Sequence, residues 1–225
     1  MDSIEVYVEA GMKKVFAGGV EWPGWCRSGR DERAALQSLV DYGSRYAQVL
    51  RNRGIQFEVP AKLEELKVVE RLEGNSTTDF GAPAIPLTAD KEGLAALDYD
   101  QSKDLLEACW LSFDQAVQIA SGKELRKGPR GGGREIDKIV EHLLESDRGY
   151  LGRLAWQYKM GREINPKEDL ARIRKAILDA LQAAVKGELP ERGPRGGILW
   201  PPRYFIRRVA WHVLDHAWEI EDRVS

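Results

Sequence analysis

The chain has 225 residues, of which 43% are hydrophobic and 31% are charged, and its formal net charge is −2 at pH 7. This composition is typical of a globular protein of one large or two modest domains. Lysine and arginine are scattered rather than clustered, so nothing in the composition favours nucleic-acid binding. No apolar run approaches the roughly 20 residues of a membrane span, and no signal peptide begins the chain. We therefore expect a cytoplasmic protein with no nucleic-acid or membrane partner.

The first 73 residues predict a small α/β domain with the element order β-β-α-β. Apolar and polar residues alternate from Ile4, and a second extended run over 15–20 completes a predicted hairpin. Apolar residues at helical spacing follow over 35–50, and 66–72 supplies a third strand. The expected unit is a sheet with one helix packed on it.

Residues 74–97 are rich in Gly, Pro, Ser and Thr and lack periodicity, which is typical of a linker. The pattern of residues 98–225 is helical, and three of its four predicted helices carry a clear apolar stripe. We therefore expect a mainly α chain with a four-helix bundle after the small α/β domain. The predicted helices run from about Asp100 to Gly122, from just after Gly133 to about Gly161, from Pro166 to Gly187, and from Pro202 almost to the C-terminus.

All three histidines of the chain lie in the predicted bundle: His142 on its second helix, and His212 and His216 on its fourth. At about 100° per residue, His212 and His216 share the helix face that is directed to the interior. Two imidazoles one turn apart can share a cation, and a facing helix can supply a third ligand. Neutral imidazole suits Zn, Ni, Fe and Cu, of which we expect Zn, Ni or Fe. Three protein ligands leave a coordination position for water or substrate, which favours catalysis.

Two interpretations of these histidines stay open, because a buried i,i+4 pair can also be a hydrogen-bonded core pair. His142 falls off the centre of its own helix's apolar stripe, which counts against a ligand role. Glu145, Asp215 and Glu219 are candidates for orienting an imidazole or moving protons, and Asp147 is a further candidate for orientation. Glu219 could instead replace a histidine as a direct ligand.

Similar Gly-Pro-Arg-Gly-Gly loops precede both helices that carry histidine, which indicates an internal repeat. Their arginines, Arg130 and Arg195, lie beside flexible backbone and a following helix N-terminus. That combination favours an anion such as a carboxylate, and two tight turns with a solvated arginine are the alternative interpretation.

A second apolar stripe on the last helix, formed by Trp211, Leu214 and Trp218, needs a cover. Either the N-terminal unit or a second subunit can supply it, so a homodimer is possible.

Two sequence runs, IVEHLLESD at 139–147 and WHVLDH at 211–216, flank a predicted third helix without histidine. In this pattern, residues 98–222 resemble the DinB/YfiT-like metalloprotein superfamily. The resemblance implies a four-helix bundle in which a helix 2 histidine and a helix 4 H-x-x-x-H pair hold a divalent metal. Assigned members are similar to thiol-dependent transferases and isomerases, which implies a low-molecular-weight thiol and a small-molecule substrate. In an alternative register His216 is the first helix 4 ligand and Ile220 the second, which would damage the site.

The run 21–36, in which a Pro-Gly turn precedes the predicted helix, is similar to the HicB-like sheet-and-helix module found in antitoxins. Two functions are therefore expected as alternatives. One is a divalent-metal-dependent transferase or isomerase that uses the three histidines. The other is a non-catalytic binding or regulatory protein, in which the HicB-like module recognises a partner and the bundle is a scaffold with a degenerate metal site.

Overall fold

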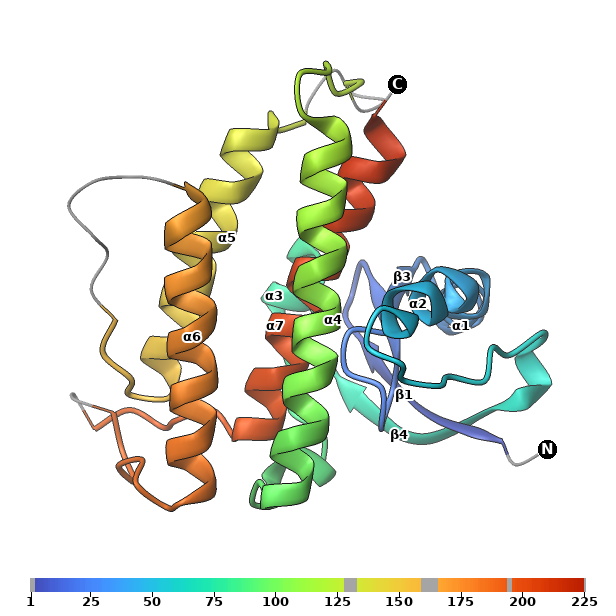
Figure 1. Cartoon of the computed structure of the whole chain (residues 1–225). Coiled ribbons are helices and arrows are strands. Elements are labelled where there is room, and N and C mark those ends of the chain that lie inside the picture. The colour runs from blue at the N-terminus through green and yellow to red at the C-terminus, as the bar shows by residue number, and fades with distance from the viewer. Residues whose placement is uncertain (1–2, 128–132, 159–165, 194–195, 225) are drawn as a thin grey trace.

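The computed structural model describes residues 3–127, 133–158, 166–193 and 196–224. It is mainly helical, with a small mixed sheet near the N-terminus, which confirms the coarse prediction of fold class. Figure 1 shows the sheet and two short helices on one side of α4 and α7, with α5 and α6 on the other side. The long helices are α4 (Ala96–Ala120), α5 (Ile136–Arg153), α6 (Pro166–Val185) and α7 (Pro202–Arg223).

The sheet has the strand order β3-β2-β1-β4. β1 pairs antiparallel with β2 and parallel with β4, while β2 pairs antiparallel with β3. The predicted hairpin and the predicted strand at 66–72 are confirmed. The predicted order β-β-α-β is wrong because it omits β3, a strand too short to show alternation. The strands are β1 (Ile4–Ala10), β2 (Val15–Gly19), β3 (Cys26–Gly29) and β4 (Leu66–Glu73).

The single helix predicted after the hairpin is two helices, α1 (Glu32–Asp41) and α2 (Gly43–Arg51). The side chain of Asp31 caps α1 by accepting the amide N–H of Ala34 at 2.8 Å. The break falls at Tyr42, next to a glycine, whose helix propensity is low. Periodicity alone did not reveal this break because both helices bury the same kind of apolar face.

The segment 74–97, expected as a linker, contains the short helix α3 (Ser76–Phe80) and packs against the sheet. The Glu9 carboxylate on β1 accepts the amide N–H of Ala84 at 2.8 Å and also the hydroxyl of Thr78. Leu87 is buried in a small apolar cluster with sheet residues. The segment therefore packs on the N-terminal sheet and is not an extended linker between two separate domains.

The ends of α6 and α7 match the sequence prediction, whereas α4 begins at Ala96, inside the predicted linker and four residues before Asp100, and α5 is shorter than predicted. That helix ends at Arg153 rather than near Gly161, and Ala155 adopts a left-handed backbone with φ of 56°. Helix α4 contacts α6 and α7, and α5 also contacts α6 and α7. No helix in the described ranges is both long enough and apolar enough to cross a bilayer.

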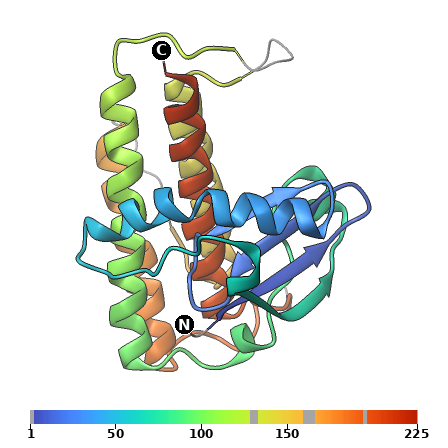
Figure 2. The same ribbon diagram turned by 90° about the vertical axis from the view of Figure 1, so that its right-hand side faces the viewer.

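The N-terminal unit covers one face of α7, where Figure 2 shows α1 and α2 running across α4 and α7. Trp211 meets Phe16 of β2 edge-on, with ring centroids 6.1 Å apart, and Trp218 lies 5.1 Å from the Tyr42 ring. Of the two covers expected for the apolar stripe of this helix, the structure contains the N-terminal unit. A single cluster of buried side chains runs from the sheet through all four long helices.

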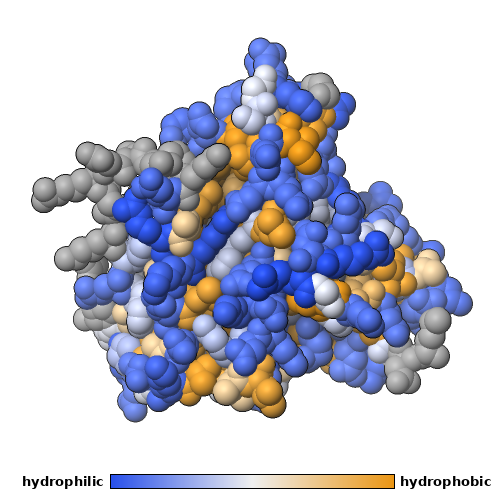
Figure 3. Space-filling model, in the orientation of Figure 1, coloured by the Kyte–Doolittle hydropathy of each residue, from blue (hydrophilic) through white to orange (hydrophobic). Residues whose placement is uncertain are grey.

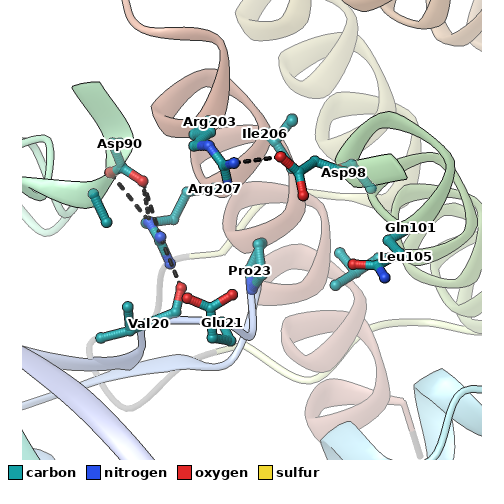
Figure 4. A pocket seen from close by; sticks show the side chains of 12 residues that line it. Val20, Glu21, Pro23, Asp90, Asp98, Gln101, Leu105, Arg203, Ile206 and Arg207 are labelled. Atoms are coloured by element: carbon teal, nitrogen blue, oxygen red, sulfur yellow. Dashed lines mark hydrogen bonds and ion pairs between the residues drawn. The ribbon is translucent and has the colours of Figure 1, made fainter. Parts of the chain in front are cut away.

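A buried ion pair joins α7 to the segment before α4. Arg207 is bonded to Asp90 in the short 3-10 helix η2 (Ala89–Lys91), with Nη2 2.9 Å from Oδ1. Its guanidinium also donates to the carbonyl oxygens of Gly19 and Val20, both at 2.9 Å. Figure 4 shows this pair beside a small cavity of about 100 Å³, with the separate pair Arg203–Asp98 on the other side. The guanidinium of Arg207 thus forms hydrogen bonds that connect the sheet, the segment before α4 and helix α7.

We predict that Asp90→Asn lowers the free energy of unfolding by about 3–5 kcal/mol, because it leaves the buried Arg207 charge without its counter-charge. Urea denaturation of the variant measures this loss. Glu141→Gln is the matched control, because it breaks an ion pair with Lys138 whose side chains are 51% and 65% exposed. It should cost no more than about 1 kcal/mol. Equal losses in the two variants would contradict a structural role for the buried pair.

Candidate metal centre

Three imidazoles converge where α5 packs against α7. His142 comes from α5, and His212 and His216 come from successive turns of α7. The Nε2 atoms of His142 and His212 are 3.2 Å apart, and one ring nitrogen from each histidine lies within 4.8 Å of the others. These three residues could hold one metal ion.

The rings are held largely out of water, which favours the neutral form of His142 and His212. His212 and His216 are each 6% exposed, and His142 is half-buried. Burial, followed by the neighbouring His216 and His142, lowers the pKa of His212 well below its usual value. Burial also lowers the pKa of His142, and a charge on Arg134 acts in the same direction. Neutral imidazole is the form that binds a metal ion.

A carboxylate orients the third ring from its outer side. Glu219 Oε2 lies 2.8 Å from His216 Nδ1, and Arg223 donates to the other carboxylate oxygen at 2.8 Å. Burial raises the pKa of Glu219, but its hydrogen bonds to His216 and Arg223 outweigh this effect and lower it. Because Nδ1 is engaged, Nε2 of His216 is the nitrogen free for an ion. Carboxylates commonly hold metal-binding histidines in this way.

The spacing of the rings suits an ion. Two nitrogens at the usual Zn–N distance are about 3.4 Å apart around a tetrahedral ion and about 3.0 Å apart around an octahedral one. The 3.2 Å between His142 and His212 lies between these values, and it also suits a direct hydrogen bond between the rings. Nδ1 of His212 is buried and has no hydrogen-bond partner among the described residues. It lacks the outer partner that Glu219 gives to His216.

Within the described residues, the other predicted acids, Glu145, Asp147 and Asp215, form no hydrogen bond with the three rings. Asp215 forms an ion pair with Arg27 of β3 at 3.1 Å, so its carboxylate is directed to the N-terminal unit. Glu145 is exposed on α5, although its charge raises the pKa of His142. Ile220, the second ligand in the alternative register, is fully buried in the apolar core. Arg130 and Arg195, predicted to bind an anion, lie outside the described residues.

Two arginines near the site did not emerge from the sequence. Arg223 positions Glu219 and also donates to the carbonyl oxygens of Arg126 and Arg134. Arg208 lies one turn before His212, and its charge contributes to the lowered pKa of that histidine. Their i,i+4 spacing to Glu219 and His212 was the available signal.

The chain's own cysteines are not placed to supply a reactive thiol. Cys26 and Cys109 are both buried and free. Burial raises the pKa of Cys26 to about 12 and raises that of Cys109 as well, so both stay protonated. Neither cysteine is therefore suited to supply a thiolate.

A separate groove of about 920 Å³ lies between α4, α5 and α6, and none of the three histidines lines it. Figure 3 shows hydrophobic patches on the outer surface of the long helices, separated by hydrophilic side chains. Exposed apolar residues on α4 include Leu111 and Ile119. We find no cluster of metal-binding side chains in the described part of the chain other than the histidines.

Comparisons of the chain with protein-family models, with curated proteins and with solved structures gave no match. The chemistry of the site therefore follows from its own residues. These are three closely spaced imidazoles, two with lowered pKa values, and a carboxylate bonded to the third.

Asp147 on α5 is a buried acid whose ionisation affects the stability of the fold. Its side chain is buried, and burial raises the pKa of the carboxyl to about 7 even though Arg174 acts to lower it. An acid whose folded pKa is raised stabilises the fold fully below its unfolded pKa of about 4. This stability is lost as the pH rises through the folded value.

We predict that Asp147→Asn stabilises the protein, because the amide cannot ionise, and that the gain grows between about pH 4 and about pH 7. Urea denaturation at several pH values measures this gain. Glu141→Gln on the exposed face of the same helix should show no such growth. A gain for Asp147→Asn that is equal at both ends of this range would show that the buried carboxyl does not titrate there.

Proposed function

We propose that this protein is a divalent-metal-dependent enzyme of the DinB/YfiT-like type, in which the four long helices form the bundle. His142, His212 and His216 hold one ion, of Zn, Ni or Fe. The observation that carries the proposal is the convergence of three imidazole nitrogens within 4.8 Å, with a carboxylate bonded to the outer nitrogen of one ring. A carboxylate in this position is a common feature of metal-binding histidines.

The reaction that this site supports best is a thiol-dependent transfer or isomerisation of a small molecule. A divalent ion bound by three protein ligands would keep a coordinated thiol in its nucleophilic thiolate form. The burial of Cys26 and Cys109 supports a low-molecular-weight thiol as the nucleophile. Glu219 fixes the ring of His216 and, through its bond to Arg223, stays ionised. Glu145, exposed on α5, is the proposed group for exchanging protons with solvent.

Cobalt(II) tests this proposal, because it reports both occupancy and thiol binding by absorption. We predict about one Co²⁺ per chain, and a sulfur-to-cobalt charge-transfer band when 2-mercaptoethanol is added. His212→Ala should abolish both signals. Asp215→Ala is the matched control on the same helix, because its carboxylate is paired with Arg27, and it should retain them. Unchanged cobalt content in His212→Ala would reject the site and favour the non-catalytic alternative.

We further predict that Glu219→Gln raises the dissociation constant of Zn²⁺ by about 10–100-fold, since it removes the charge that holds and polarises His216. Competition with a chromogenic chelator measures this constant. Glu221→Gln, whose carboxylate is bonded to Arg45 instead, should leave it unchanged. If the two variants bind Zn²⁺ equally well, Glu219 has no part in holding the ion.

A further inference from the structure

Two consecutive arginines on α7 are equally buried but differently partnered. Arg207 and Arg208 are 8% and 7% exposed. Arg207 has the carboxylate of Asp90 and two carbonyl oxygens. Arg208 donates from Nη1 to the Pro83 carbonyl oxygen and from Nη2 to the Tyr150 hydroxyl at 3.1 Å. Among the described residues, no carboxylate forms an ion pair with Arg208, and its buried Nε has no hydrogen-bond partner.

An arginine in this state calls for an explanation. A buried charge without a counter-charge is unfavourable, and so is a buried N–H donor without an acceptor. The Arg208 guanidinium carbon lies 5.0 Å from the ring centroid of Trp211, 5.4 Å from that of Tyr150 and 6.0 Å from that of Trp200. These rings stabilise a cation by their faces but accept no hydrogen bond in the plane of the guanidinium. The donor edge of Arg208 therefore lacks an anion.

The missing anionic partner of Arg208 can be related to the three histidines through the position of this arginine. Arg208 lies one turn before His212 on α7, and side chains four residues apart project side by side. The ring centroid of Tyr150 lies 5.8 Å from that of His212, so one of the aromatic rings around Arg208 also packs against the histidine cluster. His212 also has a buried nitrogen, Nδ1, without a partner in the described structure. Two unpartnered nitrogens thus lie on successive turns of one helix.

We propose that Arg208 binds the carboxylate of a small apolar or aromatic acid whose other end faces His142, His212 and His216. This inference rests on the proposed function, because it names the substrate class of the same site. Guanidinium and carboxylate form paired, charge-assisted hydrogen bonds, and the rings of Trp200 and Tyr150 would pack on the apolar body. The carboxylate can belong to the substrate or to a thiol that carries an acid group.

Of the rings around Arg208, that of Trp200 belongs to a segment that reaches the surface. Leu199 and Trp200 are half-buried, and the adjacent Ile198 is 90% exposed. The backbone N–H of Trp200 is bonded to the Arg153 carbonyl oxygen at 3.0 Å, and its ring packs against those of Tyr150 and Tyr204. Outward rotation of the Trp200 ring is the route by which an acid reaches Arg208, and it should change the fluorescence of this tryptophan.

Benzoate and its neutral counterpart benzamide test the proposal on the full chain after metal removal. We predict that benzoate binds at least about tenfold more tightly than benzamide, measured by calorimetry and tryptophan fluorescence. Arg208→Gln should abolish this preference, and Arg208→Lys should retain part of it. Arg203→Gln is the matched control, because this arginine of α7 is already paired with Asp98, and it should bind as wild type does.

Equal affinities of the wild-type protein for benzoate and benzamide, or no binding of either, would overturn the proposal without any variant. Unchanged benzoate binding in a folded Arg208→Gln protein would also overturn it. Because no metal is present, these results are independent of the cobalt measurements that test the proposed function.

The source of the carboxylate follows from cobalt-loaded protein and 3-mercaptopropionate. A charge-transfer band weakened in Arg208→Gln assigns the acid group to the thiol. A band unaffected by that change, together with a benzoate preference that the wild type shows and Arg208→Gln lacks, assigns it to the substrate. Both results support Arg208 as the anion-binding residue.

Discussion

Helix α7 is buried on almost every side, and the rest of the structure depends on how its polar residues are satisfied. Sheet, segment 74–97, α4 and α5 all pack around it, so charged groups on this helix lie in a region poor in water. Such groups are tolerated only when hydrogen bonds or counter-charges compensate them. Arg207 meets that condition through Asp90, and His216 meets it through Glu219. These bonds fix both the position of the N-terminal unit and the direction of an imidazole.

The two sides of α7 therefore have different roles. Trp211 and Trp218 are covered by aromatic residues of the N-terminal unit, and Asp215 is paired with Arg27 there. The side that carries His212 and His216 faces α5 instead. On the first side, each of these α7 side chains packs against a residue of the N-terminal unit or is paired with one. On the second side three buried nitrogens, Arg208 Nε, His212 Nδ1 and Arg223 Nη2, have no partner among the described residues, and it is on this side that we propose a ligand.

Much of this architecture could be predicted from periodicity, which gave the hairpin, the last strand of the sheet and the long helices. The short strand β3 has four residues and no alternation, and the break at Tyr42 leaves the apolar pattern of both helices intact. The residues from Leu154 to Tyr158 continue the composition of α5 without its backbone conformation, because Ala155 is left-handed. A single sequence carries little information about such local backbone choices.

The histidines illustrate the same limit for the site. The shared face of His212 and His216 followed from helix geometry, whereas His142 looked misplaced because it lies off its helix's apolar stripe. The stripe of α5 is buried in the core, and its edge meets α7, so a residue beside the stripe is the one that reaches the other two rings. Asp215 was selected by proximity in sequence alone, and it is directed to the opposite side. The sequence of one helix does not determine which neighbouring helix packs against each edge of its apolar stripe.

The interface between α5 and α7 affects how α5 is held against the rest of the protein. Among the described residues, the polar side-chain contacts across it include the histidine cluster and the bond between Tyr150 and Arg208, and His142 and His212 are 70 residues apart in the chain. If these groups bind a ligand as we propose, the ligand would join α5 to α7 directly. Its binding would then add to the stability of this helix contact in proportion to how tightly and at what concentration it binds.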